Sequence, residues 1–137
     1  MKKTMNEILA TVAAPVSSIE NWVMPNRYQL TTKFEATERG RPRGFDRRNT
    51  LELALISGFR KANATASAAV AMAAAVLRAD KAKSKIWEFW VFVDGDITKG
   101  KQIDILTVDI LNALPPVWTV VHVGEIVRRV DKLFEGD

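Results

Sequence analysis

Apolar residues over residues 5–12 recur at the spacing of one helical face, which predicts a first helix. Thr4 precedes this segment and Glu7 follows three residues later. That spacing is typical of a capping box, in which side chains satisfy the free amides of the first turn. Pro15 ends the pattern, because proline cannot continue a helix.

A second, short helix is predicted over residues 19–24, with Ser17 or Ser18 as its N-cap and Pro25 at its end. Two short helices joined by a tight turn are a candidate helix-turn-helix. In such a unit the outer face of the second helix enters the DNA major groove. The polar residues expected on that face are Ser17, Ser18, Glu20 and Asn21.

The pattern then changes from the helical period to loose alternation. Residues 28–36 alternate apolar and polar side chains, which predicts a half-buried strand. Residues 43–45 read as a short return strand, so the two are expected to form a hairpin, with Phe45 tucked beneath it.

Two longer helices follow the predicted hairpin. The third is expected to begin at Asp46 or Asn49 and to end near Asn63, with an apolar inner face and polar residues outside. The outward residues are expected to be Arg47, Arg48, Glu52 and Arg60. The fourth is expected to begin at Thr65 or Ser67 and to run to about Lys83; its many alanines favour helix and close packing.

The second half of the chain is richer in strand signals. Strands are predicted over 86–93 and 117–123, with a further strand over 102–108 and a short helix over 107–114 between them. An amphipathic helix opens at Gly124. The predicted fold class is therefore α+β: a winged helix-turn-helix with packing helices over 1–83, then a small β-rich dimerisation or sensor segment with a terminal helix over 84–137.

Composition excludes several kinds of site. The chain has 137 residues, no cysteine and one histidine, His122, so thiolate and multi-histidine metal sites are ruled out. The sequence contains no phosphate-binding loop motif and no nucleophile elbow. The aspartates at 94, 96, 104 and 109 fit turns better than a metal site. We expect no enzyme activity, no cofactor and no metal.

No targeting or membrane segment is expected. The longest apolar run covers about 12 residues, short of the about 20 needed to span a bilayer. With no cysteine, the chain suits a reducing cytoplasm, where we expect it to be located.

The charge of the chain is concentrated in one place. Residues 39–48 carry five arginines and one aspartate, a net charge of +4 that equals the formal charge of the whole protein. The arginine fork binds phosphate through two parallel hydrogen bonds and does not lose its charge near neutral pH. This arginine stretch predicts an anionic partner, and nucleic acid first of all.

The order of these parts resembles the DNA-binding half of MerR-type transcriptional regulators. The resemblance covers about residues 4–80, and its signature is the wing: Gly40 to Asn49 (GRPRGFDRRN) fits a Gly-Arg-x-Arg-aromatic pattern with one extra glycine. The chain departs from the family at Ala14-Pro15, where glycine is typical, and it lacks the family's long dimerisation helix. The resemblance implies double-stranded DNA binding. The recognition-helix positions fall on Ser17, Ser18, Glu20 and Asn21, and the wing positions on Arg39, Arg41 and Arg43.

The sequence thus predicts a cytoplasmic, homodimeric DNA-binding regulator that does not interact with membranes. Arg27, Arg47 and Arg48 are added to the residues expected to contact DNA. Two alternatives stay open. One is a non-catalytic adaptor whose basic loop binds RNA or an acidic protein. The other is a small-ligand-binding protein, and a small-molecule effector of the regulator itself is also left open.

Overall fold

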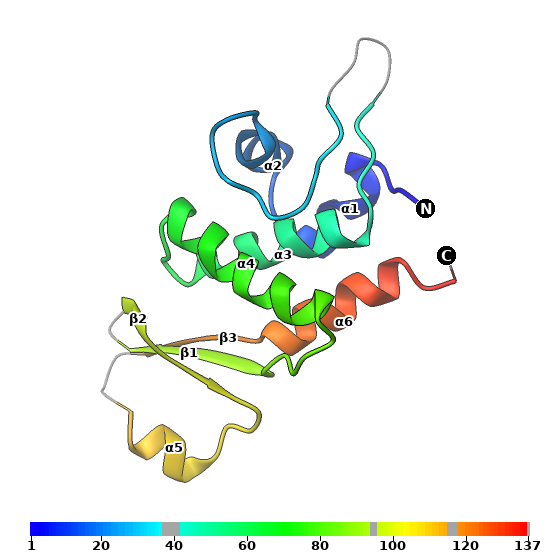
Figure 1. The fold of residues 1–137 in the computed structure, drawn as a ribbon. Coiled ribbons are helices and arrows are strands. Elements are labelled where there is room, and N and C mark those ends of the chain that lie inside the picture. The colour runs from blue at the N-terminus through cyan, green and yellow to red at the C-terminus, as the bar shows by residue number, and fades with distance from the viewer. Residues whose placement is uncertain (37–41, 94–95, 115–117, 137) are drawn as a thin grey trace.

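The computed structural model describes residues 1–36, 42–93, 96–114 and 118–136. Within these ranges it has six helices and three strands. The first half is helical (Figure 1), and its helices are α1 (Met5–Val12), α2 (Val16–Val23), α3 (Arg47–Lys61) and α4 (Ala66–Lys81). None of the described helices has the length and apolar character to cross a membrane.

The second half contains a small antiparallel sheet of order β2-β1-β3. In it β1 (Phe89–Val93) lies between β2 (Asp96–Ile103) and β3 (Trp118–Val121). A short helix, α5 (Val108–Asn112), connects β2 to β3, and α6 (Val123–Leu133) follows β3 directly. The α+β class predicted from the sequence is confirmed at this level.

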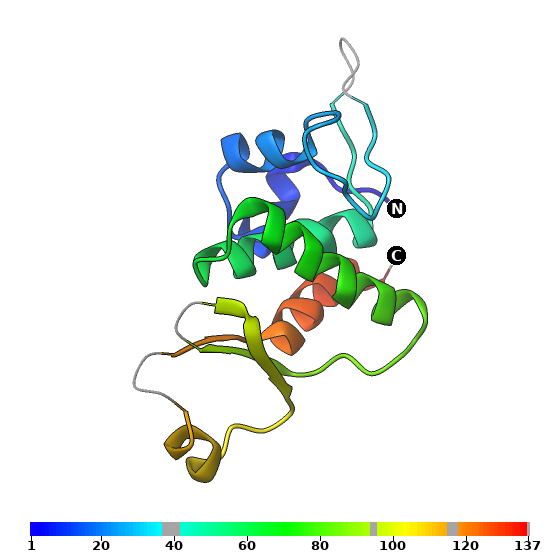
Figure 2. The ribbon, with the colours of Figure 1, turned by 60° about the vertical axis from the view of Figure 1, so that its left-hand side comes forward.

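Helix α3 is the centre of the molecule. It packs against α1, α4 and α6, and its residues 49–57 are all buried. Its Phe59 also meets the sheet through Trp90, with ring centroids 5.1 Å apart. Seen in two views, α2 and the loop after it lie on one side of α3, and the sheet and α5 lie on the other (Figures 1 and 2).

Most helices follow the sequence pattern closely. Thr4 and Glu7 form the predicted capping box, and Thr65 caps α4 by accepting a hydrogen bond from the Ala68 amide. Asp46 caps α3, and Asn63 lies just beyond its end with a positive φ of 70°. These elements are set by neighbouring residues, which is why local patterns locate them.

Several expectations about the first half are wrong. Residues 28–36 do not form a strand; the Thr31 and Thr32 amides bond to a side-chain acceptor in place of a neighbouring strand. Helix α2 begins at Val16 with Pro15 at its N-cap position, so neither Ser17 nor Ser18 caps it. Glu52 does not face solvent; it is fully buried.

Candidate nucleic-acid interface

The turn between α1 and α2 is tight and is held by side chains of α3. Ala13 ends α1 in the left-handed conformation, with φ of 58°. Its carbonyl oxygen accepts hydrogen bonds from Ser57 Oγ at 3.1 Å and from Lys61 Nζ at 2.7 Å. Both donors belong to α3. The angle between α1 and α2 is therefore fixed by α3 as well as by Pro15.

Helix α2 has the two faces expected of it. Ile19, Trp22 and Val23 are buried against the core. The polar residues predicted to read DNA lie on the opposite, accessible side: Ser17 and Glu20 are exposed, and Ser18 and Asn21 are partly exposed. The helix carries no cation. Any contact it makes with DNA would be by hydrogen bonds from its serine, asparagine and backbone groups to phosphates or base edges, or by Glu20 accepting from a cytosine amine.

The segment predicted as the first wing strand is held by a buried carboxylate. Glu52 Oε2 accepts a hydrogen bond from the Thr31 amide at 2.7 Å, and Oε1 accepts from the Thr32 amide at 2.9 Å and from its hydroxyl at 2.7 Å. The side-chain amide of Asn49 donates to the Thr32 hydroxyl at 2.9 Å and to the Lys33 carbonyl oxygen at 3.2 Å. Residues 31–36, the first arm, are thus anchored to α3 at their start.

Residues 42–46, the second arm, are anchored differently. Phe45 is buried and exchanges two backbone hydrogen bonds with Lys3, of 2.8 and 2.9 Å. The predicted return strand is therefore a single bridge to the N-terminal segment, while Phe45 does tuck inward as expected. Its ring meets Phe34 of the first arm edge-on, with centroids 6.3 Å apart.

The two arms are also joined to each other. Glu35 accepts a hydrogen bond from the Gly44 amide at 2.8 Å and pairs with Lys2 at 2.5 Å. A Cβ on Gly44 would lie 3.0 Å from the Glu35 carboxylate, so the extra glycine of the sequence signature permits this close approach. The arms run side by side on the α2 side of α3 (Figures 1 and 2). Arg39 and Arg41 lie between them in the sequence, outside the described residues.

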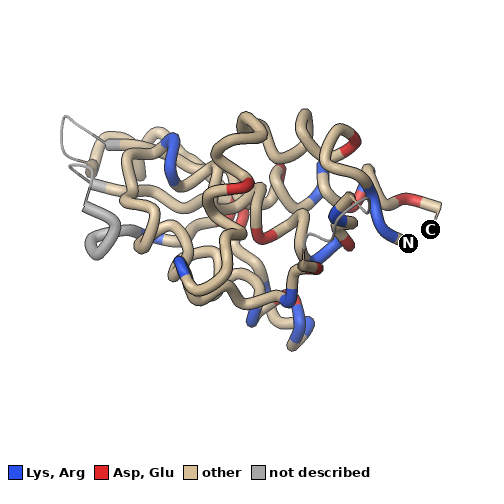
Figure 3. Tube along the Cα trace, turned by 90° about the horizontal axis from the view of Figure 1, so that it is seen from above, with Lys and Arg blue, Asp and Glu red and all other residues tan. Residues whose placement is uncertain are grey.

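The remaining arginines predicted to contact DNA differ in their surroundings. Arg27 is exposed, with its guanidinium 5.9 Å from the centre of the Tyr28 ring. Arg43 is partly exposed on the second arm. Seen from above, cationic and acidic positions are interspersed on this side of the molecule (Figure 3). The described residues thus bring Arg27 and Arg43 to the same side as α2, without a continuous basic patch.

Arg47 and Arg48 have partners inside the protein. Arg47 makes a two-bond ion pair with Asp80 at 2.9 and 3.0 Å, and its Nε donates to Asp131 at 2.6 Å. The hydrogen bonds to these carboxylates raise the pKa of Arg47. Arg48 donates to the Leu77 carbonyl oxygen at 3.2 Å. Arg47 therefore ties the start of α3 to α4 and α6, and we leave both residues out of the interface proposed below.

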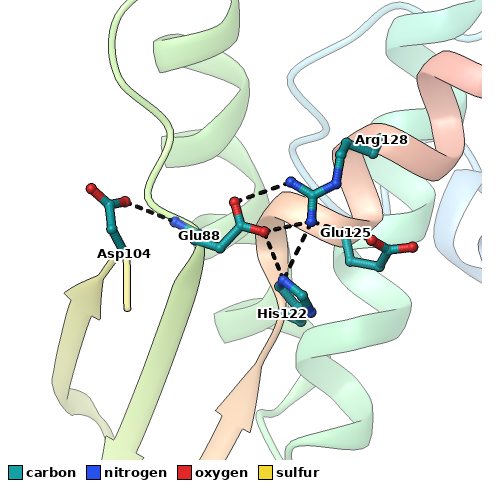
Figure 4. Close-up of polar contacts among 5 residues, drawn as sticks. All are labelled: Glu88, Asp104, His122, Glu125 and Arg128. Carbon is teal, nitrogen blue, oxygen red and sulfur yellow. Dashed lines mark hydrogen bonds and ion pairs between the residues drawn. The ribbon is translucent and has the colours of Figure 1, made fainter. Parts of the chain in front are cut away.

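A second polar cluster lies at the start of α6, far from these arms along the chain (Figure 4). The Glu88 carboxylate contacts His122 Nε2 at 2.7 Å and the Arg128 guanidinium at 2.5 and 3.1 Å. Arg128 also reaches Glu125 at 3.2 Å. Hydrogen bonds from Arg128 and His122 lower the pKa of Glu88 to about 2.

This cluster links the chain before β1 to α6 and does not resemble a metal centre. The His122 ring stacks on Phe89, with centroids 4.3 Å apart, and the Glu88 carbonyl oxygen accepts from the Gly124 amide at 3.0 Å. The contacts tie the chain before β1 to the start of α6. No group of acidic and histidine side chains that could hold a metal ion occurs in the described part of the chain.

Sequence reasoning missed the α3 side chains that hold the interface: Asn49, Glu52, Ser57 and Lys61. The sequence does contain one signal that Glu52 is buried. The run Leu51 to Ile56 is apolar at every position except Glu52, and a helix that is apolar all round is a buried helix. A lone carboxylate in it must then be buried and hydrogen-bonded. Comparison with known proteins gives no further guide, because no family model, no curated protein and no solved structure matches the chain.

Proposed function

We propose that this protein is a sequence-specific regulator of transcription that binds double-stranded DNA through α1, α2 and the two-armed loop. One observation carries the proposal. The polar outer face of α2 and an arginine-bearing loop lie on the same side of α3, and buried side chains of α3 anchor the turn before α2 and the first arm of that loop. A helix and an adjacent basic loop presented together suit a major groove and the phosphates beside it.

The roles divide by chemistry. Ser17, Asn21 and Glu20 are the residues proposed to contact base edges, since hydroxyl, amide and carboxylate groups discriminate donors from acceptors in the major groove. Arg27, Arg43 and the loop arginines at 39 and 41 are proposed to contact phosphates. Phosphate contacts position a protein on DNA and make its binding depend on salt, whereas base contacts give sequence preference.

The test begins with selection of bound duplexes from a random pool, followed by anisotropy titrations of the selected and a scrambled duplex. Replacing Arg39 and Arg41 together by alanine is expected to weaken both duplexes about tenfold or more and to reduce the salt slope by about two. Asn21→Ala is expected to weaken the selected duplex about tenfold and the scrambled duplex much less. Arg129→Gln with Lys132→Gln removes two charges from exposed positions on α6 and serves as the matched control for the double arginine variant.

Two outcomes would contradict the proposal. If the double arginine variant binds duplexes as the unaltered protein does, the loop does not contact phosphate. If Asn21→Ala weakens both duplexes equally, α2 does not read sequence. Tighter binding to single-stranded RNA than to any selected duplex would favour the alternative of an RNA-binding adaptor.

A further inference from the structure

The segment between β2 and β3 leaves apolar side chains exposed. Residues 104–114, the α5 segment, include the exposed side chains of Ile105 and Val108, which keep 69% and 71% of their surface accessible. No residue of α5 is buried, and α5 has no extensive packing with another described helix or strand. In both ribbon views α5 lies beyond the sheet, on the side away from α2 and the two arms (Figures 1 and 2).

Such a segment is costly unless something covers it. Burying a branched aliphatic side chain is favourable relative to leaving it in water. The segment is nevertheless well formed, because Thr107 caps α5 by accepting a hydrogen bond from the Ile110 amide at 3.2 Å. Asp104 at its start is fixed by an ion pair with Lys85. Apolar side chains on an ordered, projecting helix are typical of a protein-protein interface.

Charge decides which partner fits. The chain has 20 lysines and arginines, yet none lies between Lys101 and Arg128. The segment therefore offers no cation to a nucleic acid or to an acidic protein. Its own carboxylates are Asp104, already paired with Lys85, and Asp109, so it offers little to a basic protein either. A nearly neutral apolar surface meets a copy of itself without like-charge repulsion.

We propose that the α5 segment is the surface through which two copies of this chain associate about a two-fold axis. The arrangement leaves α2 and both arms of each copy uncovered, because they lie on the other side of α3. Dimerisation by this surface does not depend on whether the protein binds DNA. If it does bind DNA, the dimer presents two recognition units to two half-sites.

The test is sedimentation velocity of the full chain over a range of concentrations, comparing the unaltered protein with a double variant, Ile105→Asp with Val108→Asp. Val108 is the first residue of α5, where an aspartate favours the helix, so the variant keeps the segment folded. The unaltered protein is expected to form dimers, and the variant is expected to raise the dimer dissociation constant by at least about a hundredfold. Far-UV circular dichroism checks that the variant is folded.

The matched control adds the same two charges outside the segment, as Ser67→Asp with Ser84→Asp, both at exposed positions. This control is expected to dimerise like the unaltered protein. A monomeric unaltered protein at every concentration would overturn the proposal, and so would a double variant that dimerises normally. An unaltered protein that forms the dimer but does not bind DNA would count against the proposed function and leave this inference intact.

Discussion

Replacing Glu52 by glutamine tests whether a buried carboxylate anchors the first arm. In the folded protein this fully buried carboxylate accepts three hydrogen bonds, one on Oε2 and two on Oε1. A glutamine carbonyl in place of Oε1 would keep the two bonds from Thr32. The amide nitrogen in place of Oε2 would face the Thr31 amide, which is 2.7 Å away from that position, so two donors would meet.

The cost follows from these contacts. Losing a hydrogen bond to a charged acceptor costs about 1.5–3 kcal/mol, and the bonds that remain weaken because the charge is gone. A neutral amide is easier to bury than a carboxylate, and this offsets part of the loss. We expect the free energy of unfolding to fall by about 2 kcal/mol, with the structural effect concentrated at residues 31 and 32.

Two measurements separate this effect from general damage. Urea denaturation gives the free energy of unfolding, and hydrogen exchange reports the Thr31 and Thr32 amides individually. Both amides should exchange much faster in Glu52→Gln under conditions where the core amides of α3 do not. Glu135→Gln, at an exposed position, is the matched control. A change of stability below about 0.5 kcal/mol together with unchanged exchange at both amides would refute the reasoning.

Two further predictions concern the cluster around Glu88. A Cβ on Gly124 would lie 2.2 Å from the Glu88 carboxylate, so Gly124→Ala should displace Glu88 from Arg128 and His122 and destabilise the protein by about 1 kcal/mol. In a Glu88→Ala background the same change should be neutral or stabilising, because alanine favours helix. A double-mutant cycle from urea denaturation checks this reversal. The pKa of Glu88 lies at about 2 in the folded protein against an ordinary 4.5, so its stabilising contribution is complete above about pH 4.5 and is lost as the pH falls toward 2. The stability difference between the unaltered protein and Glu88→Gln should therefore shrink over that interval, and a difference independent of pH would contradict the assignment.

The sequence located the helices well because their signals are local. The capping box at Thr4, the Thr65 cap and the apolar faces of α3, α4 and α6 each depend on residues within one or two turns. The same locality explains the main failure. The alternation over residues 28–36 is compatible with any extended backbone, and what decides its structure is Glu52, 20 residues further along the chain. No periodicity identifies an acceptor at that distance.

The candidate interface was predictable only in part. The outer face of α2 carries the residues expected there, because a helix of known phase fixes which side chains face out. The partners of Arg47 were not predictable, since Asp80 and Asp131 lie 33 and 84 residues away in the sequence. A basic residue beside an arginine-rich loop is predicted from sequence to belong to that loop, although here Arg47 joins α3 to α4 and α6.

The buried polar side chains show what α3 contributes. Those found among the described residues are Asn49, Thr50, Glu52 and Ser57, and all four belong to α3. Burying polar groups is costly unless they are hydrogen-bonded, and apolar side chains of similar size would pack there at lower cost. Three of the four bind a neighbouring segment: Asn49 and Glu52 hold the first arm, and Ser57 holds the α1–α2 turn.

Polar contacts of this kind specify a position more sharply than apolar contacts do, because hydrogen bonds depend on direction as well as distance. An apolar α3 would still form a core, but it would leave the first arm and the turn free to adopt several arrangements. We infer that α3 sets the spacing between α2 and the two-armed loop, and that this spacing must match the distance from a major groove to the neighbouring phosphates if the protein reads DNA. Loss of either anchor should therefore weaken sequence preference more than it weakens binding to nonspecific duplex, since phosphate contacts tolerate small displacements that base contacts do not.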